Sequence, residues 1–397
     1  MNLKILNIED KCTGCAACVN VCPYQCLQLK PNDEGFYYPY YDGTNCVECH
    51  LCERTCHVVT PQTHGTPDED SFYIYHNLSD DVLERSSSGG AFSLFAEWVI
   101  SQGGVVYGSA YNAEKERLEV QSTENATLDA LRKSKYVESF TGASFSEIRR
   151  QLKAGRKVMY CGSPCQVRGL RQFLNSTNTP LDNIILMDFA CHGVPSNDCF
   201  SQYKRMFESK RKKVVSVDFR HKDFGKRGQM WHDMTLRLGF SDGTSKVFPR
   251  YDSYYYYYEP FYNNLFLRKS CYTCDLILHS DADISIGDFW GISKYKQVND
   301  SNKGISYICF NTDKCKSIWL EISNKGFSEK LPFDAISYQY KERKYKSQLI
   351  PERDAFARRV QSVGFVDAVC EHYGRWNILK TIYTFRIKSF IKKLIRR

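Results

Sequence analysis

Apolar and polar positions follow a regular order in the middle of the chain. Short apolar runs predict strands at residues 71–77 and 105–112. Between them, apolar residues recur at the spacing of one helix face, at Phe92, Phe95, Ala96 and Val99. Two later segments, residues 157–174 and 183–200, each predict a strand, a loop and a helix. This alternation favours an α/β fold, in which the loops that follow the strands meet at one edge of a sheet.

Composition is ordinary for a globular chain except in its cysteines. The 397 residues suggest two or three domains, and 42% hydrophobic with 25% charged residues is a usual balance. The chain has 18 cysteines. We find no secretory signal and no apolar window long enough to span a bilayer, so we expect a cytoplasmic protein with reduced thiols. Metal or cluster ligation is therefore the leading interpretation of the cysteines.

Two cysteine runs near the N-terminus share one spacing. "CTGCAACVNVCP" and "CVECHLCERTC" follow the pattern of a bacterial two-cluster ferredoxin, in which the fourth cysteine of each run ligates the other cluster. We therefore predict one [4Fe–4S] cluster on Cys12, Cys15, Cys18 and Cys56. We predict a second one on Cys46, Cys49, Cys52 and Cys22. Zinc is the alternative and fits the repeated run poorly.

The other cysteines divide into two kinds. Cys165 and Cys191 each follow a predicted strand, and Cys271 and Cys274 form a C-x-x-C pair, so these four are candidates for a third cluster. Cys161 belongs to the strand before Cys165. The remaining thiols are expected to be small buried residues: Cys26, Cys199, Cys309, Cys315 and Cys370.

Residues 87–90, "SSGG", precede the predicted helix that contains Phe92. Free N–H groups and the positive end of the helix dipole would suit the phosphate of a nucleotide cofactor, although a plain helix cap explains the same residues. Basic residues near Lys133 could close over the phosphate or lie in a solvated loop.

Six motifs then follow one another behind the ferredoxin run: "SSGGAF", "KSKYVES", "CGSPCQ", "DFACHGVPS", "RKSCYTC" and "DADISIGDFWG". In this order, from Cys12 to about residue 312, the chain resembles the beta subunit of coenzyme F420-reducing hydrogenase and its dehydrogenase relatives. The resemblance implies a non-covalently bound flavin, FAD or FMN, with an iron–sulfur cluster beside it. It also implies electron transfer to a two-electron acceptor, which is a deazaflavin in the namesake enzymes.

The resemblance also assigns roles to residues. Four would lie at the flavin phosphate: Ser88, Gly89, Gly90 and Ala91. Four more would line the flavin: Lys133, Ser134, Lys135 and Tyr136. The third cluster would be held by Cys165, Cys191, Cys271 and Cys274. His192 and Gly193 would lie close to the flavin ring, and His192 is a candidate proton donor or, alternatively, a structural histidine. Three residues would shape the rest of the pocket: Asp283, Asp288 and Trp290.

The expected fold class is an α+β domain of the bacterial-ferredoxin type, followed by an α/β flavin-binding domain with a mixed sheet. The predicted domains are residues 1–62 (ferredoxin), 63–200 (flavin-binding), 201–340 (C-terminal domain of the same family) and 341–397 (basic helical tail). A polar linker is expected at residues 60–70.

Two features could contact partners. A tyrosine run at residues 251–262 and a basic loop at residues 219–232 lie where contacts with the acceptor are expected, and four cations of the loop would bind an acidic acceptor or be solvated: Arg220, Lys222, Lys226 and Arg227. The net charge is +9, and the last 18 residues carry seven Lys or Arg and no acid, so the rest of the chain is at +2. The tail would suit an anionic membrane surface or pack on the protein body.

We therefore expect an iron–sulfur flavoprotein oxidoreductase. It would relay electrons from two ferredoxin clusters through a third cluster to a flavin, and from there to coenzyme F420 or another organic acceptor. Its partners would be a redox protein or external donor and the acceptor, without nucleic acid, and it would be cytoplasmic or peripheral to the inner face of the membrane. The alternatives are a non-catalytic electron-transfer subunit and a membrane-recruited accessory protein of a cell-envelope polysaccharide pathway.

Overall fold

The computed structural model describes residues 3–61, 72–226, 229–248, 254–276, 280–290, 301–332, 335 and 342–395. Most of the linker expected at residues 60–70 lies outside these ranges, as do Arg227 and the first residues of the tyrosine run.

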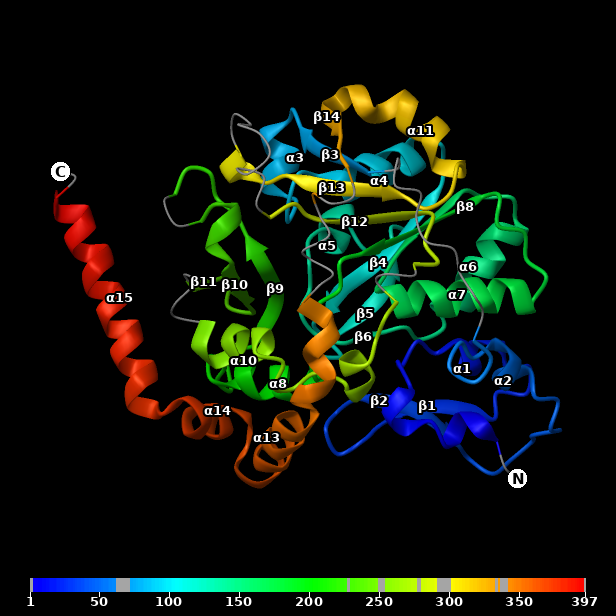
Figure 1. The fold of residues 1–397 in the computed structure, drawn as a ribbon, viewed down its shortest axis with the longest axis horizontal. Coiled ribbons are helices and arrows are strands. Elements are labelled where there is room, and N and C mark those ends of the chain that lie inside the picture. The colour runs from blue at the N-terminus through cyan, green and yellow to red at the C-terminus, as the bar shows by residue number, and fades with distance from the viewer. Residues whose placement is uncertain are drawn as a thin grey trace.

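A nine-stranded mixed sheet forms the centre of the molecule (Figure 1). In spatial order its strands are β14 (Gly326–Lys330), β3 (Phe72–Asn77), β13 (Ser306–Phe310), β12 (Ile284–Asp288), β8 (Ile184–Phe189), β7 (Val158–Cys161), β4 (Val105–Asn112), β5 (Arg117–Ser122) and β6 (Ser139–Phe140). Strands β12, β8, β7 and β4 are parallel neighbours, whereas β14, β3 and β13 pair antiparallel at one side. The mixed sheet and the strands expected at residues 71–77 and 105–112 are confirmed. The sheet takes strands from both sides of the boundary predicted at residue 200.

Successive residues of the central strands point to opposite faces of the sheet, and both faces are apolar. Helices therefore cover both faces. Tyr107, Tyr160 and Leu186 pack on the side of α6 (Ser144–Lys153) and α7 (Pro164–Ser176). Met159 and Met187 pack on the opposite side against α4 (Ala91–Ser101) and α11 (Lys314–Ile322). The helices expected from the sequence at α4 and α7 are therefore confirmed, and Cys161 ends β7 as expected.

A three-stranded antiparallel sheet lies beside the large one, with β9 (Val214–His221), β10 (Thr235–Phe240) and β11 (Ser245–Phe248). Its core contains α8 (Asn197–Arg205), α10 (Glu259–Tyr262) and two buried residues of the tyrosine run, Tyr257 and Tyr258. Their hydroxyls donate to the carbonyls of Tyr136 and Phe219 at 2.6 and 2.7 Å. The interpretation of these tyrosines as acceptor contacts was wrong, because they pack in the core.

The N-terminal module consists of α1 (Ala17–Val21), the antiparallel pair β1 (Leu27–Pro31) and β2 (Tyr37–Tyr41), and α2 (Leu51–Thr55). Both helices of the module lie against α7 of the body (Figure 1). Short helices complete the body: α3 (Asp80–Glu84) and α5 (Leu128–Leu131).

A buried arginine joins the module to the body. Arg268, which is 1% exposed, donates from Nη1 to the carbonyl of Cys12 at 3.0 Å and from Nη2 to the carbonyl of Tyr37 at 2.7 Å. Its Nη2 also pairs with the buried carboxylate of Glu138 at 2.5 Å. Arg353, equally buried, forms a second link by pairing with Glu34 of the module and donating to the carbonyl of Leu267.

Three helices form the C-terminal region: α13 (Ile350–Val363), α14 (Phe365–Tyr373) and α15 (Arg375–Ile395). These helices lie within the range 341–397, which was predicted as a helical tail. None of the helices in the described part of the chain has the length and apolar character needed to cross a membrane.

We expect Arg268→Met to lower the free energy of unfolding by about 3 kcal/mol or more, because it leaves the carboxylate of Glu138 buried without its cation. The double variant Arg268→Met/Glu138→Gln should regain part of the loss, because no charge then stays buried. Chemical denaturation followed by circular dichroism measures both effects.

The control is Lys269→Met, because Lys269 pairs with Asp10 at 3.3 Å on the surface. Loss of that exposed pair should cost less than about 1 kcal/mol. Equal losses in Arg268→Met and Lys269→Met would contradict the structural role of Arg268.

Candidate functional site

The thiols of the N-terminal module gather in two groups. The first thiol group lines one cavity and consists of Cys12, Cys15, Cys18 and Cys56. The second thiol group lines another cavity and consists of Cys22, Cys46, Cys49 and Cys52. The structure thus brings together the same two sets that the spacing predicts, including the exchange of the fourth cysteine between the runs.

The exchange results from a local structure that occurs twice. Ala16 and His50 both adopt a left-handed conformation, with φ of 65° and 54°, and each begins a five-residue helix. Each helix carries the third cysteine of its run and ends at the fourth, Cys22 or Cys56, which is extended. Because the chain leaves the helix at that residue, the fourth thiol points to the other group.

Backbone N–H groups point at the first thiol group. Those of Gly14 and Ala17 donate to Cys12 and Cys15, and those of Val58 and Val59 donate to Cys56. Gly14 has a φ of +70°, as expected for the tight loop. Burial raises the pKa of the Cys15 thiol to about 12, so its thiolate needs a nearby positive charge, which the iron of a cluster supplies. Thiolate ligands with backbone donors fit a [4Fe–4S] cluster.

Cys26 has a position that the sequence did not indicate. It is buried, as expected, but its Sγ lies 3.3 Å from that of Cys22, and it lines the same cavity as the second thiol group. The other thiols expected to be small buried residues are buried: Cys199, Cys309, Cys315 and Cys370.

A third thiol group lies in the body of the protein. Electrostatic contacts join the thiol of Cys165 to those of Cys191, Cys271 and Cys274. Cys165 lies in the first turn of α7 and Cys191 follows β8, so both occupy the carboxyl end of a parallel strand, as predicted. Burial raises the pKa of the Cys271 thiol to about 12, so this group also needs a positive charge to hold thiolates. Its role as a cluster site stays a prediction.

Helix α7 connects the first and third thiol groups. Its first turn carries Cys165, and one turn later a Cβ on Gly169 would lie 2.8 Å from Sγ of Cys15. Glycine is therefore required where the helix meets the first thiol group. Arg268 connects the same two groups on another path, because it binds the carbonyl of Cys12 and its own carbonyl accepts from the N–H of Cys271 at 2.9 Å.

The two segments expected at the flavin lie side by side. The N–H of Ser134 donates to Oγ of Ser87 at 2.7 Å. Gly90, with a φ of +90°, is the cap of α4. The N–H of Gly89 donates to Oγ of Ser306 at 2.9 Å and a Cβ there would lie 2.1 Å from the carbonyl oxygen of Tyr75, so Gly89 is closely packed against the sheet. The structure therefore supports the helix-cap interpretation for Gly90, and Gly89 is occupied by contacts within the protein.

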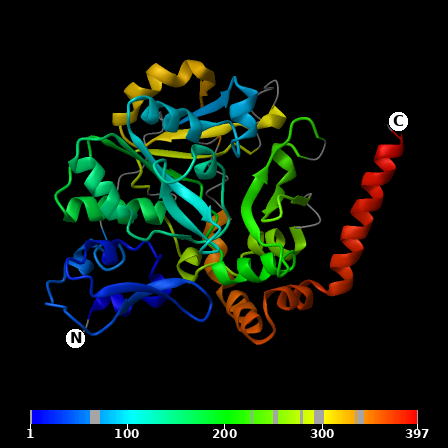
Figure 2. The ribbon, with the colours of Figure 1, turned by 180° about the vertical axis from the view of Figure 1, so that it is seen from behind.

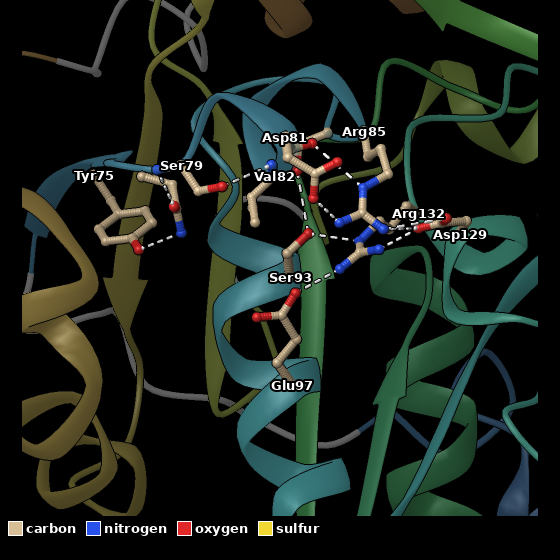
Figure 3. Close-up of polar contacts among 11 residues, drawn as sticks. Tyr75, Ser79, Asp81, Val82, Arg85, Ser93, Glu97, Asp129 and Arg132 are labelled. Atoms are coloured by element: carbon tan, nitrogen blue, oxygen red, sulfur yellow. Dashed lines mark hydrogen bonds and ion pairs between the residues drawn. The ribbon is translucent and has the colours of Figure 1, made fainter.

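A polar network fixes the start of both segments (Figure 3). Oγ of Ser93 on α4 lies 3.1 Å from Oγ of Ser86 and accepts from Nε of Arg132 at 2.9 Å. Arg132 also pairs with Glu97 at 2.6 Å and with Asp129. Since Ser86 precedes the loop at residues 87–90 and Arg132 precedes Lys133, the network holds the two segments at a set distance.

Buried cations converge on this loop. Arg220 donates to the carbonyl of Ser87 at 3.3 Å and pairs with Asp288 at 2.7 Å, and Lys222 donates to the carbonyl of Ser88 at 3.3 Å. Both cations are 3% exposed. The alternative that these two cations are solvated was therefore wrong, whereas binding of an acidic acceptor stays a prediction. Arg220 belongs to β9, and of the three described cations only Lys226, which pairs with Asp223, is exposed.

Two lysines in this region have carbonyls as their partners. Within the described ranges, no carboxylate lies within 4.0 Å of the ammonium of Lys135 or of Lys222, whereas Lys133 pairs with Asp218 at 2.8 Å. Burial lowers the pKa of Lys135 to about 7, and burial together with the charge of Arg220 lowers the pKa of Lys222. An anion bound in this region would favour the charged forms of both lysines.

Aromatic contacts connect this region to the third thiol group. The hydroxyl of Tyr136 accepts from Arg220 at 3.1 Å, and the Tyr136 ring lies 5.2 Å from that of Phe261. The ring of His192, the residue after Cys191, lies 4.8 Å from the ring of Phe261. A Cβ on Gly193 would lie 3.4 Å from that of Cys271. His192 and Gly193 thus lie beside the third thiol group, and both their place at the flavin ring and the role of His192 as a proton donor stay predictions.

The other residues expected at the pocket lie apart from one another. Asp288 reaches the loop through Arg220, and Trp290 stacks on Trp231 at 4.6 Å. Asp283, at the other end of β12, pairs with Lys314 at 2.8 Å. The sequence analysis missed Asp188 on β8, whose pKa burial raises to about 7. The sequence signal for Asp188 was its position directly after the apolar residues 184–187.

Two family models match parts of the chain. A family model described as the C terminus of the coenzyme F420 hydrogenase/dehydrogenase beta subunit matches residues 155–335, and one described as "4Fe-4S dicluster domain" matches residues 11–59. Residues 155–335 therefore belong to the coenzyme F420 hydrogenase/dehydrogenase beta-subunit family. This beta-subunit homologue carries a 4Fe–4S dicluster domain at its N-terminus, and the two matches together indicate an iron–sulfur electron-transfer oxidoreductase.

Curated relatives match the N-terminal module. An uncharacterised ferredoxin of Methanocaldococcus jannaschii is 36% identical over 56 residues, which are 14% of this chain and 71% of the relative. Ferredoxin-3 of Nostoc is 34% identical over 62 residues, 12% of this chain and 64% of the relative. Among solved structures, a chain of the F420-reducing [NiFe] hydrogenase complex from Methanosarcina barkeri aligns over 73% of the homologue and 92% of that chain, with 16% identity and a TM-score of 0.47.

We expect Gly169→Ala to displace the thiol of Cys15, which lies 2.8 Å from the new Cβ. The retained iron should fall, and the electron paramagnetic resonance spectrum of one ferredoxin cluster should change. In a helix without this contact the same exchange stabilises by about 1 kcal/mol, so a loss of iron is attributable to the contact.

The matched control is Asn175→Ala at an exposed position of the same helix. It should leave the iron content and the spectrum unchanged. If Gly169→Ala gives the same iron and the same spectrum as Asn175→Ala, the close contact between α7 and the first thiol group is refuted.

Proposed function

We propose that this chain is an iron–sulfur flavoprotein oxidoreductase that exchanges electrons between ferredoxin-type clusters and an organic two-electron acceptor. The observation that carries the proposal is the pair of lysines, Lys135 and Lys222, that have no carboxylate partner in the described structure and lie in a region connected to a group of four thiols. Iron–sulfur clusters transfer single electrons, whereas a flavin accepts them singly and releases them in pairs.

The charge of the region favours a nucleotide cofactor. Lys133 and Arg220 are neutralised by Asp218 and Asp288, whereas Lys135 and Lys222 donate to carbonyls. A buried ammonium without an anion is unfavourable, so a phosphate at this place would gain two charge-assisted hydrogen bonds. We propose that these two lysines, rather than the N–H of Gly89, hold the phosphate of FAD or FMN.

The third thiol group would hold a [4Fe–4S] cluster next to the flavin. Tyr136, Phe261 and His192 form a continuous contact from the loop at residues 87–90 to Cys191. We propose that these rings exclude water between the two cofactors and that His192 holds a proton for the acceptor.

The body of the protein orients the ferredoxin module toward this site. The first thiol group lies against α7, which carries Cys165, because a Cβ on Gly169 of this helix would lie 2.8 Å from Sγ of Cys15. We propose that electrons enter at the second group from a redox partner protein or external donor, and leave the module through the first. Coenzyme F420 is one candidate acceptor, and other organic acceptors suit the same site.

The test is anaerobic purification with iron, sulfide and flavin quantified. Three cubanes require about twelve irons per chain, and we expect one flavin. Cys274→Ala should lower the iron to about eight per chain, because one cubane is lost, and leave the ferredoxin signals unchanged.

The matched control is Cys161→Ala, since Cys161 ends β7 four residues before Cys165 and belongs to no thiol group. It should keep the full iron content. About eight irons and no flavin in the unmodified chain would instead indicate a non-catalytic electron carrier.

Flavin affinity should depend on Lys222 and on pH. We expect Lys222→Gln to weaken flavin binding by about tenfold or more, since a charge-assisted hydrogen bond contributes about 1.5–3 kcal/mol. In the unmodified protein, affinity should fall from about pH 6 to about pH 8.5, because Lys135, with a pKa of about 7, is charged only at the lower pH. Fluorescence titration of the apoprotein measures both.

The control for Lys222→Gln is Lys226→Gln, because the exposed Lys226 lies four residues along the chain and pairs with Asp223 at 2.7 Å. It should bind flavin normally. In Lys135→Met the pH dependence should flatten, and a dependence equal to that of the unmodified protein would exclude Lys135 from the phosphate site.

A further inference from the structure

Helix α15 stands apart from the rest of the fold. Gly374, with a φ of +79°, separates it from α14. Near its start, Ile378 is buried and Ile382 packs against the same core. Beyond these turns the helix extends clear of the other elements, as the ribbon shows from both sides (Figures 1 and 2). The alternative that the whole tail packs on the body therefore holds only for its first turns.

One side of α15 exposes large apolar side chains. They are Trp376 (83% exposed), Leu379 (45%), Tyr383 (68%) and Ile387 (41%). The spacing of three, four and four residues places them on one stripe of a helix, on a different face from Ile378 and Ile382. A contiguous exposed apolar stripe is typical of an interaction surface.

The same helix is strongly basic. From residue 380 to the end, the chain has seven Lys or Arg and no acid, whereas the rest of the chain has a net charge of +2. The 21 residues of α15 span roughly 30 Å. Five of the seven basic residues fall within its bounds: Lys380, Arg386, Lys388, Lys392 and Lys393.

We propose that α15 binds an anionic membrane surface, lying in the plane of the lipid headgroups. An apolar stripe on a basic helix provides both contributions that such binding needs, burial of apolar area and attraction to anionic lipid. A second copy of the chain would bring seven further positive charges against these seven, and like charges repel. A nucleic acid would leave the apolar stripe in water. The proposal is independent of the chemistry proposed for the flavin region.

The test is co-sedimentation of the full chain with vesicles of phosphatidylcholine, with and without phosphatidylglycerol. We expect binding to the anionic vesicles only, decreasing as salt is raised, with a blue shift of tryptophan fluorescence that is absent in Trp376→Phe. Replacing Lys388, Lys392 and Lys393 by Gln should weaken binding by about tenfold or more.

The matched control is Leu320→Ser on α11, because Leu320 is 80% exposed on another face of the molecule. It should bind like the unmodified chain, whereas Trp376→Ser/Tyr383→Ser should bind weakly. Circular dichroism of each variant confirms folding. Equal pelleting of the full chain and of a chain ending at residue 379 overturns the proposal. Equal binding to neutral vesicles overturns it too, as does a dimer formed through α15 at the expense of vesicle binding.

Discussion

The buried guanidinium of Arg268 is the contact on which the arrangement of the two parts depends. It binds the backbone of the module at Cys12 and Tyr37, the carboxylate of Glu138 in the body, and its own carbonyl lies in the turn that carries Cys271. A charge removed from water in this way is stable only while all of its partners stay in place. The module is therefore held in one orientation, and the first thiol group is held against α7.

The body uses buried charge in two ways. Around Arg268, a carboxylate of opposite sign compensates the charge, and the result is structural. Around Lys135 and Lys222, the partners in the described structure are carbonyls, and no carboxylate there stabilises the charged forms of the two lysines. Burying either kind of cation costs free energy, but only at the two lysines can a bound ligand offset that cost. This contrast separates the residues that hold the fold together from those that are available to bind a cofactor.

The features that the sequence predicted are local ones. The cysteine runs, the helix at α4 and the strand that ends at Cys161 depend on spacings of a few residues, and the structure has them where expected. Contacts between distant residues had no such signal. Arg268 and Glu138 lie 130 positions apart, and Lys222 looks like any solvated lysine until β9 packs beside the loop at residues 87–90. Each tyrosine of the tyrosine run has a hydroxyl, and only the fold shows which hydroxyls donate to carbonyls inside the core.

The crossing of the fourth cysteines has a consequence for synthesis of the chain. Each thiol group of the module takes three cysteines from one run and one from the other. During synthesis, Cys52 completes the second thiol group and Cys56 completes the first. The last ligands of the two sites leave the ribosome within about one helical turn of each other. A nascent chain therefore passes almost directly from having no complete site to having two, and a chain truncated between the runs has none. The two sites therefore form almost together, and truncation between the runs removes both.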